Sequence, residues 1–299
     1  MAAAHRAIHA CALAGIAFYQ LNMPIIHAIV LGAVQGLSEF LPISSSGHLI
    51  LVPWLFRWND FAGQPGLEKA FDTALHIGTT VAMIGYFWRD LSRLVVAGLG
   101  SIRRRSIVHN DERLAWLLLL SAIPGVITGA LLDNFITENL GQEWLIAIML
   151  IVFGIILWAA DRLPGKRPDG DFRRRDAVMM GTAQALALQP GVSRSGVTIS
   201  AGRYLGFDRD GAARVSFLMA TPITAGAATY KMLKLQTNGG VPHGFGAAFA
   251  WGIVVSGVVG FLAVAGLMRL VRTRTFTPFV IYRIALGLFV LTLIATGVR

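Results

Sequence analysis

The sequence predicts an all-α polytopic membrane protein with six transmembrane helices and two re-entrant helical hairpins in an inverted-topology repeat. Three observations support this fold class. Hydrophobic residues make up 55% of the 299-residue chain and charged residues only 14%, whereas soluble domains carry about 25% charged residues. Apolar segments long enough to cross a bilayer recur along the chain. Two polar, proline-broken segments also recur at half the chain length.

The composition excludes several other classes of protein. The net charge of +10 arises from Arg clusters beside apolar segments, without interleaved aromatic residues, so it fits orientation in a bilayer and not nucleic-acid binding. The single cysteine, Cys11, excludes an internal disulfide and a cysteine-based metal site. We expect residues 1–22 to be an N-terminal extension to which we assign no function, because Met23 offers an alternative start.

The first repeat is expected over residues 23–160, and it begins with a hairpin. The apolar helix 25–41 is at the lower limit for a membrane span, and after a break at 42–47 the segment 48–56 adds only half a helix. Irregular backbone at membrane depth is tolerated only where protein or a water-filled cavity covers it, which favours a re-entrant hairpin. Three full spans follow, at 71–88, 112–132 and 144–160. The loop between the first two includes an amphipathic segment, 91–99, expected at the membrane interface.

A basic linker at 161–176 separates the halves, and the second repeat is expected over residues 177–299. This half also begins with a hairpin, at about 177–206, which breaks at Gln189-Pro190-Gly191. Three further spans follow, at about 212–233, 245–268 and 276–297. Arg283, seven residues into the last span, is expected to snorkel toward the cytoplasmic face.

The charges of the loops predict the topology. Loops 89–111, 161–176 and 269–275 are rich in Arg, whereas loop 133–143 carries acidic residues and no Lys or Arg. Six spans with two non-crossing hairpins place all three basic loops on the cytoplasmic side; hairpins that crossed fully would alternate their sides. Each half then crosses three times, so the halves are inverted. The hairpins enter from opposite sides and meet near the midplane, with the site open to the periplasm.

The densest polar cluster lies in the first hairpin, over residues 35–48. Gln35 and Glu39 stand at i and i+4 and therefore share one helix face. Beyond Pro42, a Ser-Ser-Ser-Gly run can direct several backbone N–H groups toward whatever the carboxylate faces. This arrangement is typical of half of a site for phosphate or a metal ion.

The other half of the site is predicted 149 residues later. The positions that recur are Gly32, Gln35, Leu37, Ser44, Ser46, Gly47 and Ile50, as Gly181, Gln184, Leu186, Ser193, Ser195, Gly196 and Ile199. The second copy has Arg194 where the first has Ser45. Seven identities at one offset indicate a duplication, although two unrelated Ser/Gly loops are an alternative reading.

The two hairpin tips together suggest phosphate chemistry. An ionisable side chain at the midplane costs about 3 kcal/mol even on lenient scales, so Glu39 and Arg194 are expected to be partners; a purely structural ion pair is the plainer alternative. Arg194 offers a bidentate donor for phosphate. The residues predicted to bind phosphate with it are Ser44, Ser46, Gly47, Ser193, Ser195 and Thr198.

The remaining polar groups supply candidates for the chemical step. Ser45 could act as a nucleophile, with His48, three residues on, as its base or as the acid for the leaving group. Glu39 and Gln35 could bind a hard divalent cation such as Mg²⁺ through oxygen. Asp72 and His76 could line the approach to the site, or could simply be solvated at the interface.

The motifs resemble those of a known family. Gln35-x-x-x-Glu39 followed by Phe40-Leu41-Pro42-Ile43-Ser44-Ser45-Ser46-Gly47-His48, and later Pro190-Gly191-Val192-Ser193-Arg194-Ser195-Gly196-Val197-Thr198, are similar to the two signatures of the bacterial undecaprenyl-diphosphate phosphatases, the bacitracin-resistance type. The resemblance extends from about Met23 to the C-terminus. The family accepts Glu or Gln at the first position, and Gln35 leaves Glu39 as the only carboxylate of that pair.

The resemblance implies hydrolysis of a polyprenyl diphosphate lipid to its monophosphate, dependence on Mg²⁺ or Ca²⁺, and residence among the lipids of the bacterial inner membrane. By position it implies Glu39, Ser45, His48 and Arg194 as catalytic residues. An acid-phosphatase-type lipid phosphatase is excluded, because no histidine follows Ser193-Arg194 within that motif. A covalent phosphoserine and direct attack by water both remain open, as does a homodimer. A flippase for the lipid phosphate is the alternative function, since broken helices at the midplane also serve carriers.

Overall fold

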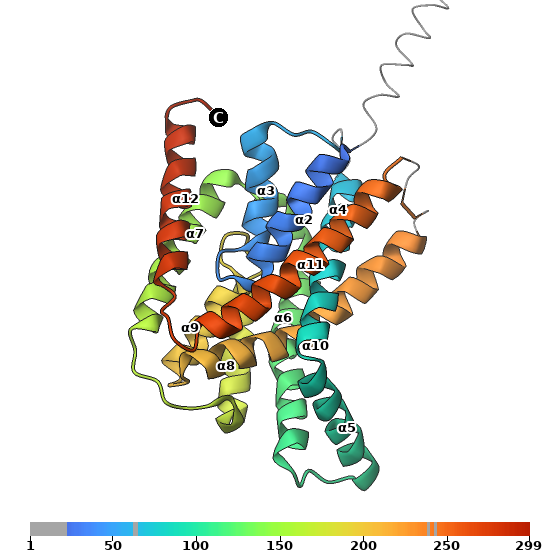
Figure 1. Ribbon diagram of the computed structural model, residues 1–299, viewed down its shortest axis with the longest axis vertical. Helices are drawn as coiled ribbons and strands as arrows, with labels where there is room; N and C mark the ends of the chain where they lie inside the picture. The colour runs from blue at the N-terminus through green and yellow to red at the C-terminus, as the bar shows by residue number, and fades with distance from the viewer. Residues whose placement is uncertain (1–22, 62–64, 238–239, 242–243) are drawn as a thin grey trace, which may run out of the picture.

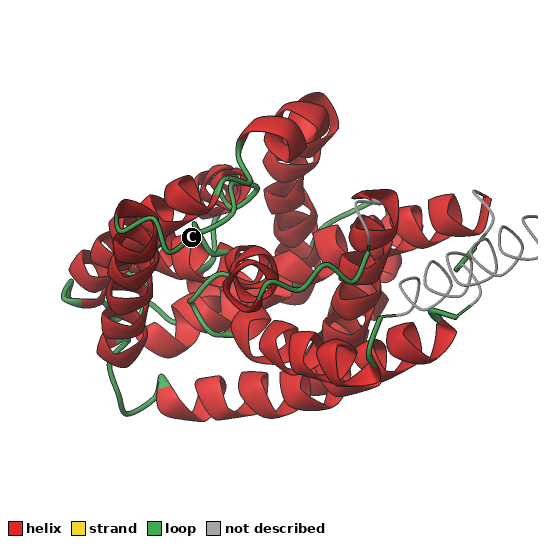
Figure 2. Cartoon of the chain, turned by 90° about the horizontal axis from the view of Figure 1, so that it is seen from above, coloured by secondary structure: helices red, strands yellow, loops and turns green. Residues whose placement is uncertain are grey.

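The computed structural model describes residues 23–61, 65–237, 240–241 and 244–299. This part of the chain is helical, apart from one isolated β-bridge between Arg167 and Phe207, and the predicted all-α class is confirmed. Seen from above, the described chain consists of helices joined by loops (Figure 2). The predicted N-terminal extension, residues 1–22, lies outside the described residues.

The helices follow the order expected from the sequence. Those that precede the basic linker are α2 (Ile25–Phe40), α3 (Ser45–Phe56), α4 (Pro65–Tyr86), α5 (Trp88–Arg104), α6 (Asn110–Asn139) and α7 (Glu143–Asp161). Those within and after it are η1 (Asp169–Asp171), a short 3₁₀ helix, then α8 (Arg174–Leu186), α9 (Arg194–Tyr204), α10 (Arg209–Thr237), α11 (Gly246–Leu270) and α12 (Thr277–Ala295). The amphipathic segment 91–99 lies inside α5, which packs along α6.

Within the described residues four helices are long and apolar enough to cross a membrane, which makes the chain a multi-pass membrane protein. They are Asn110–Leu132, Glu143–Asp161, Gly246–Leu270 and Thr277–Ala295. The predicted span 212–233 falls within α10, and the predicted span 71–88 overlaps α4 but runs past its end at Tyr86. Both helices are less apolar because they carry polar side chains such as Asp72, His76 and Arg214.

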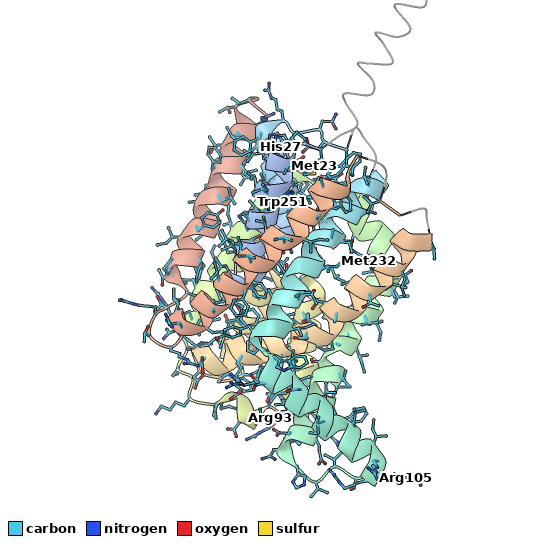
Figure 3. The ribbon with its side chains drawn as sticks, turned by 45° about the vertical axis from the view of Figure 1, so that its right-hand side comes forward. Met23, His27, Arg93, Arg105, Met232 and Trp251 are labelled. Atoms are coloured by element: carbon cyan, nitrogen blue, oxygen red, sulfur yellow. The ribbon has the colours of Figure 1, made fainter. Side chains whose placement is uncertain are left out.

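The two hairpins lie at different heights along the molecule (Figure 1). The ends of α2 and α3 that point away from their shared turn lie toward the top of the view, as does the C-terminus, whereas the α5–α6 connection lies at the opposite end. Met23 and His27 lie near the first end, and Arg93 and Arg105 lie toward the second (Figure 3). α11 packs along α2 and α4, α12 along α7, and α8 along α6.

Close helix packing positions the end of α2. A Cβ atom added to Gly36 would lie 2.8 Å from the backbone nitrogen of Gly260, so the backbones of α2 and α11 come into direct contact. Phe40, the last residue of α2, is fully buried and meets Phe217 of α10 edge-on, with 5.8 Å between ring centroids. These contacts fix the helix end that carries Glu39.

Candidate active site

In each hairpin the turn that joins the two helices has the same geometry. Ser44 precedes α3 with a φ of 79°, and Ser193 precedes α9 with a φ of 72°. Each side chain accepts a hydrogen bond from the backbone N–H of a following glycine, Gly47 at 3.4 Å and Gly196 at 3.2 Å. Positive φ is uncommon for a serine and persists where the surroundings hold it. The predicted correspondence between Ser44 and Ser193 therefore extends to backbone conformation.

The tips of the two hairpins are in contact. The backbone N–H of Gly191 donates to Ser44 Oγ at 3.0 Å. Ser195 Oγ donates to the carbonyl oxygen of Leu41 at 3.2 Å. Each turn thus satisfies polar groups that the other leaves exposed at the end of a broken helix.

Arg283 of α12 joins the two turns, and the expectation that it snorkels to the cytoplasmic face is wrong. Its side chain is fully buried. Its Nη1 donates to the carbonyl of Pro42 at 3.0 Å, and its Nη2 donates to those of Gly191 at 2.8 Å and Val192 at 3.0 Å. Its Nε donates to the carbonyl of Leu150 at 3.1 Å. Carbonyls freed by the broken helices satisfy the guanidinium in place of interfacial water.

Glu39 lies at the centre of the polar cluster. Its Oε1 accepts a hydrogen bond from Arg194 Nη2, which forms the predicted ion pair between the hairpins. Its Oε2 accepts from Ser45 Oγ at 2.6 Å and from Gln35 Nε2 at 3.1 Å. The carboxylate side chain is only 8% exposed. Low local polarity strengthens interactions between charges, so this pair is far stronger than a surface ion pair.

His48 is held away from Ser45 by two other partners. Its Nδ1 is 2.7 Å from the carbonyl oxygen of Ser44, and its Nε2 is 2.7 Å from the hydroxyl of Tyr282. A carbonyl only accepts, so Nδ1 carries the hydrogen and, in the neutral ring, Nε2 accepts from Tyr282. The rings of His48 and Tyr282 also stack, 5.6 Å apart. Since Ser45 donates to Glu39 instead, the carboxylate is the base within its reach.

The other predicted phosphate-binding residues form the walls of the cluster. Ser193 Oγ lies 3.3 Å from Ser195 Oγ. Thr198 Oγ1 donates to the carbonyl of Arg194 at 2.7 Å and so braces the first turn of α9. Ser46 is half-buried and makes no side-chain hydrogen bond within the described part of the chain.

Two buried polar atoms beside Glu39 have no hydrogen-bond partner among the described residues. They are Arg194 Nη1, a donor, and Gln35 Oε1, an acceptor. Buried polar groups are nearly always paired, so an unpaired donor and an unpaired acceptor beside a buried carboxylate are candidate contacts for a ligand. The donor suits a phosphate oxygen and the acceptor suits a cation.

His76 of α4 also reaches the cluster, and its place there settles one question that the sequence left open. Its Nε2 lies 3.6 Å from Glu39 Oε2, so the side chain is part of the site and not merely solvated at an interface.

Tyr282 was missed by sequence reasoning because a single tyrosine in an apolar helix carries no signal. The sequence does contain a sign that Arg283 is important. A charged side chain inside a membrane span needs polar partners.

The described residues offer few ligands for a metal ion. They contain no group of three or more His, Cys, Asp or Glu side chains placed to hold one. The Glu39 carboxylate and the free Gln35 Oε1 nevertheless provide oxygen, which Mg²⁺ and Ca²⁺ prefer. Mg²⁺ commonly binds through one or two carboxylates together with substrate phosphate and water. The residues present therefore fit a cation whose remaining ligands come from the substrate and water.

Comparison with known proteins connects this geometry to a family. The model of the family described as "Bacitracin resistance protein BacA" matches residues 28–289. An "Undecaprenyl-diphosphatase" of Pelobacter propionicus is 46% identical over 278 residues, covering 92% of this chain and 99% of the relative. Proteins of the same name from Moorella thermoacetica and Nocardioides sp. are each 46% identical, over 89% and 91% of this chain and 96% and 97% of their own lengths.

Proposed function

The chain belongs to the bacitracin resistance protein BacA family, and on that premise we propose that it hydrolyses undecaprenyl diphosphate to undecaprenyl phosphate and inorganic phosphate. Such an enzyme recycles the lipid carrier of cell-wall synthesis, and its activity confers resistance to bacitracin. The relatives named undecaprenyl-diphosphatase cover nearly the whole chain. The substrate combines a long apolar tail with a compact anionic head, which suits a polar cluster enclosed by apolar helices.

The observation that carries the proposal is the Glu39–Arg194 pair with one guanidinium nitrogen unpaired. Arg194 Nη2 is engaged by Glu39, while Nη1 is buried without a partner. Leaving a buried donor unpaired costs about 1–3 kcal/mol. A phosphate oxygen at Nη1 would remove that cost and place the phosphorus beside Ser45 and Glu39.

The chemical step follows from the hydrogen bonds of Ser45. A nucleophilic oxygen, either Ser45 Oγ or a water molecule, attacks the terminal phosphorus, and Glu39 takes the proton that this oxygen releases. The bond between the terminal phosphorus and the bridging oxygen breaks, and its electron pair leaves with undecaprenyl phosphate. Attack by water gives inorganic phosphate directly, whereas attack by Ser45 gives a phosphoserine, which water then hydrolyses to release inorganic phosphate and regenerate the hydroxyl. Arg194 stabilises the charge that develops on the phosphoryl oxygens. His48, held in one tautomer by Ser44, is the candidate to handle the proton of the leaving group.

Glu39 and Gln35 would hold a divalent cation, Mg²⁺ or Ca²⁺. When bound, such an ion neutralises phosphate charge and thereby makes the phosphorus easier to attack. Glu39 then has two roles, as a ligand and as the base near Ser45, and the second hairpin contributes the compensating charge of Arg194.

We further propose the topology of six spans with α2–α3 and α8–α9 as re-entrant hairpins, in an inverted repeat of residues 23–160 and 177–299 in the inner membrane. The similar turns at Ser44 and Ser193 support the repeat. The basic α5–α6 connection lies opposite the open end of the α2–α3 hairpin (Figure 1). By the positive-inside rule this connection faces the cytoplasm, so the site opens to the periplasm.

The experiment that tests this function is a phosphate-release assay on purified protein in detergent, where no transmembrane gradient exists. We expect inorganic phosphate to be released from undecaprenyl diphosphate, and we expect a chelator to abolish the release and added Mg²⁺ or Ca²⁺ to restore it. A protein that binds the lipid but releases no phosphate with either cation would be a carrier, which is the rival reading.

A further inference from the structure

His76 touches Glu39 but has no part in the chemistry described so far. It lies on α4, outside both hairpins, and its side chain is 36% exposed. Its Nε2 is 3.6 Å from Glu39 Oε2. Its Nδ1 is 2.8 Å from the backbone carbonyl oxygen of Asp72, one turn earlier. Neither sequence motif includes this residue.

The hydrogen bond to Asp72 determines what His76 presents to the site. A carbonyl oxygen only accepts, so Nδ1 carries the hydrogen, and the Nε2 of a neutral imidazole is then a lone pair. That lone pair faces Glu39 Oε2, which is itself an acceptor. Two acceptors facing each other repel unless a positive charge lies between them, either a proton on His76 Nε2, which makes an ion pair with Glu39, or a bound cation.

A third acceptor belongs to the same cluster. Gln35 is fully buried, its Nε2 donates to Glu39 Oε2 at 3.1 Å, and its Oε1 has no partner. The Arg194 guanidinium donates through Nη2 to the other carboxylate oxygen, Oε1, and its Nη1 has no partner among the described residues. Glu39 Oε2 already accepts hydrogen bonds from Ser45 and Gln35, and the described residues offer no donor to Gln35 Oε1. A cation bound beside the carboxylate would satisfy this acceptor together with His76 Nε2.

We propose that His76 is a ligand of the divalent cation, sharing it with Glu39 and Gln35. This inference rests on the proposed function, and it deepens it by assigning a protein nitrogen to a shell otherwise made of oxygen atoms. The Nδ1 bond to Asp72 is the kind of outer-shell contact that fixes the orientation of a metal-bound histidine. α4 packs against both α10 and α11, so the imidazole is presented from a rigid support.

A nitrogen ligand has a spectroscopic signature that an ion pair between His76 and Glu39 does not. We would load purified full-length protein with Mn²⁺ alone and with Mn²⁺ plus inorganic pyrophosphate, and record electron spin echo modulation from coordinated ¹⁴N. We expect nitrogen modulation in the wild type and its loss in His76→Gln. His27→Gln is the matched control, because His27 pairs with Asp60 outside the site and should keep both the modulation and the activity.

Binding measurements make the same point without spectroscopy. The amide of His76→Gln replaces nitrogen by oxygen, so Mn²⁺ affinity should fall by about tenfold or more, whereas Ca²⁺, which takes oxygen ligands, should be affected less. His76→Ala should lower the affinity for both Mn²⁺ and Ca²⁺. His48→Gln should keep the nitrogen modulation. Loss of the modulation in this variant would mean that His48, and not His76, is the nitrogen ligand.

The outcomes separate two claims, that His76 is a ligand of the cation and that the protein is a phosphatase. Absence of nitrogen modulation in wild-type protein, absence of bound Mn²⁺ even with pyrophosphate, or modulation that survives in His76→Gln would overturn the role of His76. Phosphate release measured on the same samples tests the proposed function separately. If phosphate release persists while the nitrogen modulation is absent, the proposed phosphatase activity stands and only the assignment of His76 as a metal ligand fails.

Discussion

Glu39→Gln is expected to lower kcat for phosphate release by about 10³-fold. Glutamine has nearly the same shape, so packing at the end of α2 is preserved while the negative charge is removed. The variant loses the negative charge that pairs with Arg194. It also loses the base whose Oε2 accepts a hydrogen bond from Ser45 Oγ at 2.6 Å. The measurement is the steady-state rate of phosphate release at saturating substrate in detergent, with thermal unfolding recorded to show that the variant is folded.

Glu112→Gln is the matched control for that change. Glu112 is also a buried glutamate with an arginine partner, Arg104, but it lies at the start of α6. Its replacement should leave kcat within about twofold of the wild type, because it contacts no part of the site. A kcat for Glu39→Gln within about tenfold of the wild type would contradict the role given to the carboxylate.

The second large effect is expected on stability, from Arg283→Met. Removing the guanidinium leaves the carbonyls of Pro42, Gly191, Val192 and Leu150 without the donor that they share. Each buried acceptor left without a donor costs about 1–3 kcal/mol, so the loss of these bonds together is expected to cost about 3–5 kcal/mol. For a chain of this size that corresponds to a fall in Tm of about 10 °C, measured by thermal unfolding of the purified protein in detergent.

Arg272→Met controls for the loss of an arginine as such. Arg272 is 62% exposed and pairs with Asp210 at 3.3 Å, and exposed ion pairs contribute about 0–1 kcal/mol. Its Tm should stay within about 2 °C of the wild type. Equal Tm values for Arg283→Met and the wild type would mean that Arg283 does not hold the two turns together.

Much of the fold could be predicted from local signals. Pro42 and the following serines marked the end of α2, and Gln189-Pro190-Gly191 marked the turn before α9, because proline and glycine interrupt helices for steric reasons. The 149-residue offset correctly paired Ser44 with Ser193, whose φ angles differ by only a few degrees. The span expected at 144–160 matches α7 to within one residue at each end.

The partners of individual side chains could not be predicted in the same way. Ser45 and His48 are three residues apart, which favoured a direct pair, yet the first turn of α3 offered His48 the carbonyl of Ser44. Its other partner, Tyr282, is 234 residues away. The charge of Arg283 indicated only that partners were needed, and those partners are turn carbonyls brought together by tertiary packing.

The most direct test of the central claim is a double-mutant cycle on Glu39 and Arg194, measured as kcat/KM for phosphate release. If the two hairpins meet to form one reaction centre, Glu39→Gln and Arg194→Lys should be strongly non-additive, with a coupling energy of about 2 kcal/mol or more. The double variant should then be little worse than the poorer single variant. Losses that multiply, with coupling below about 0.5 kcal/mol, would show that the acid and the guanidinium act apart.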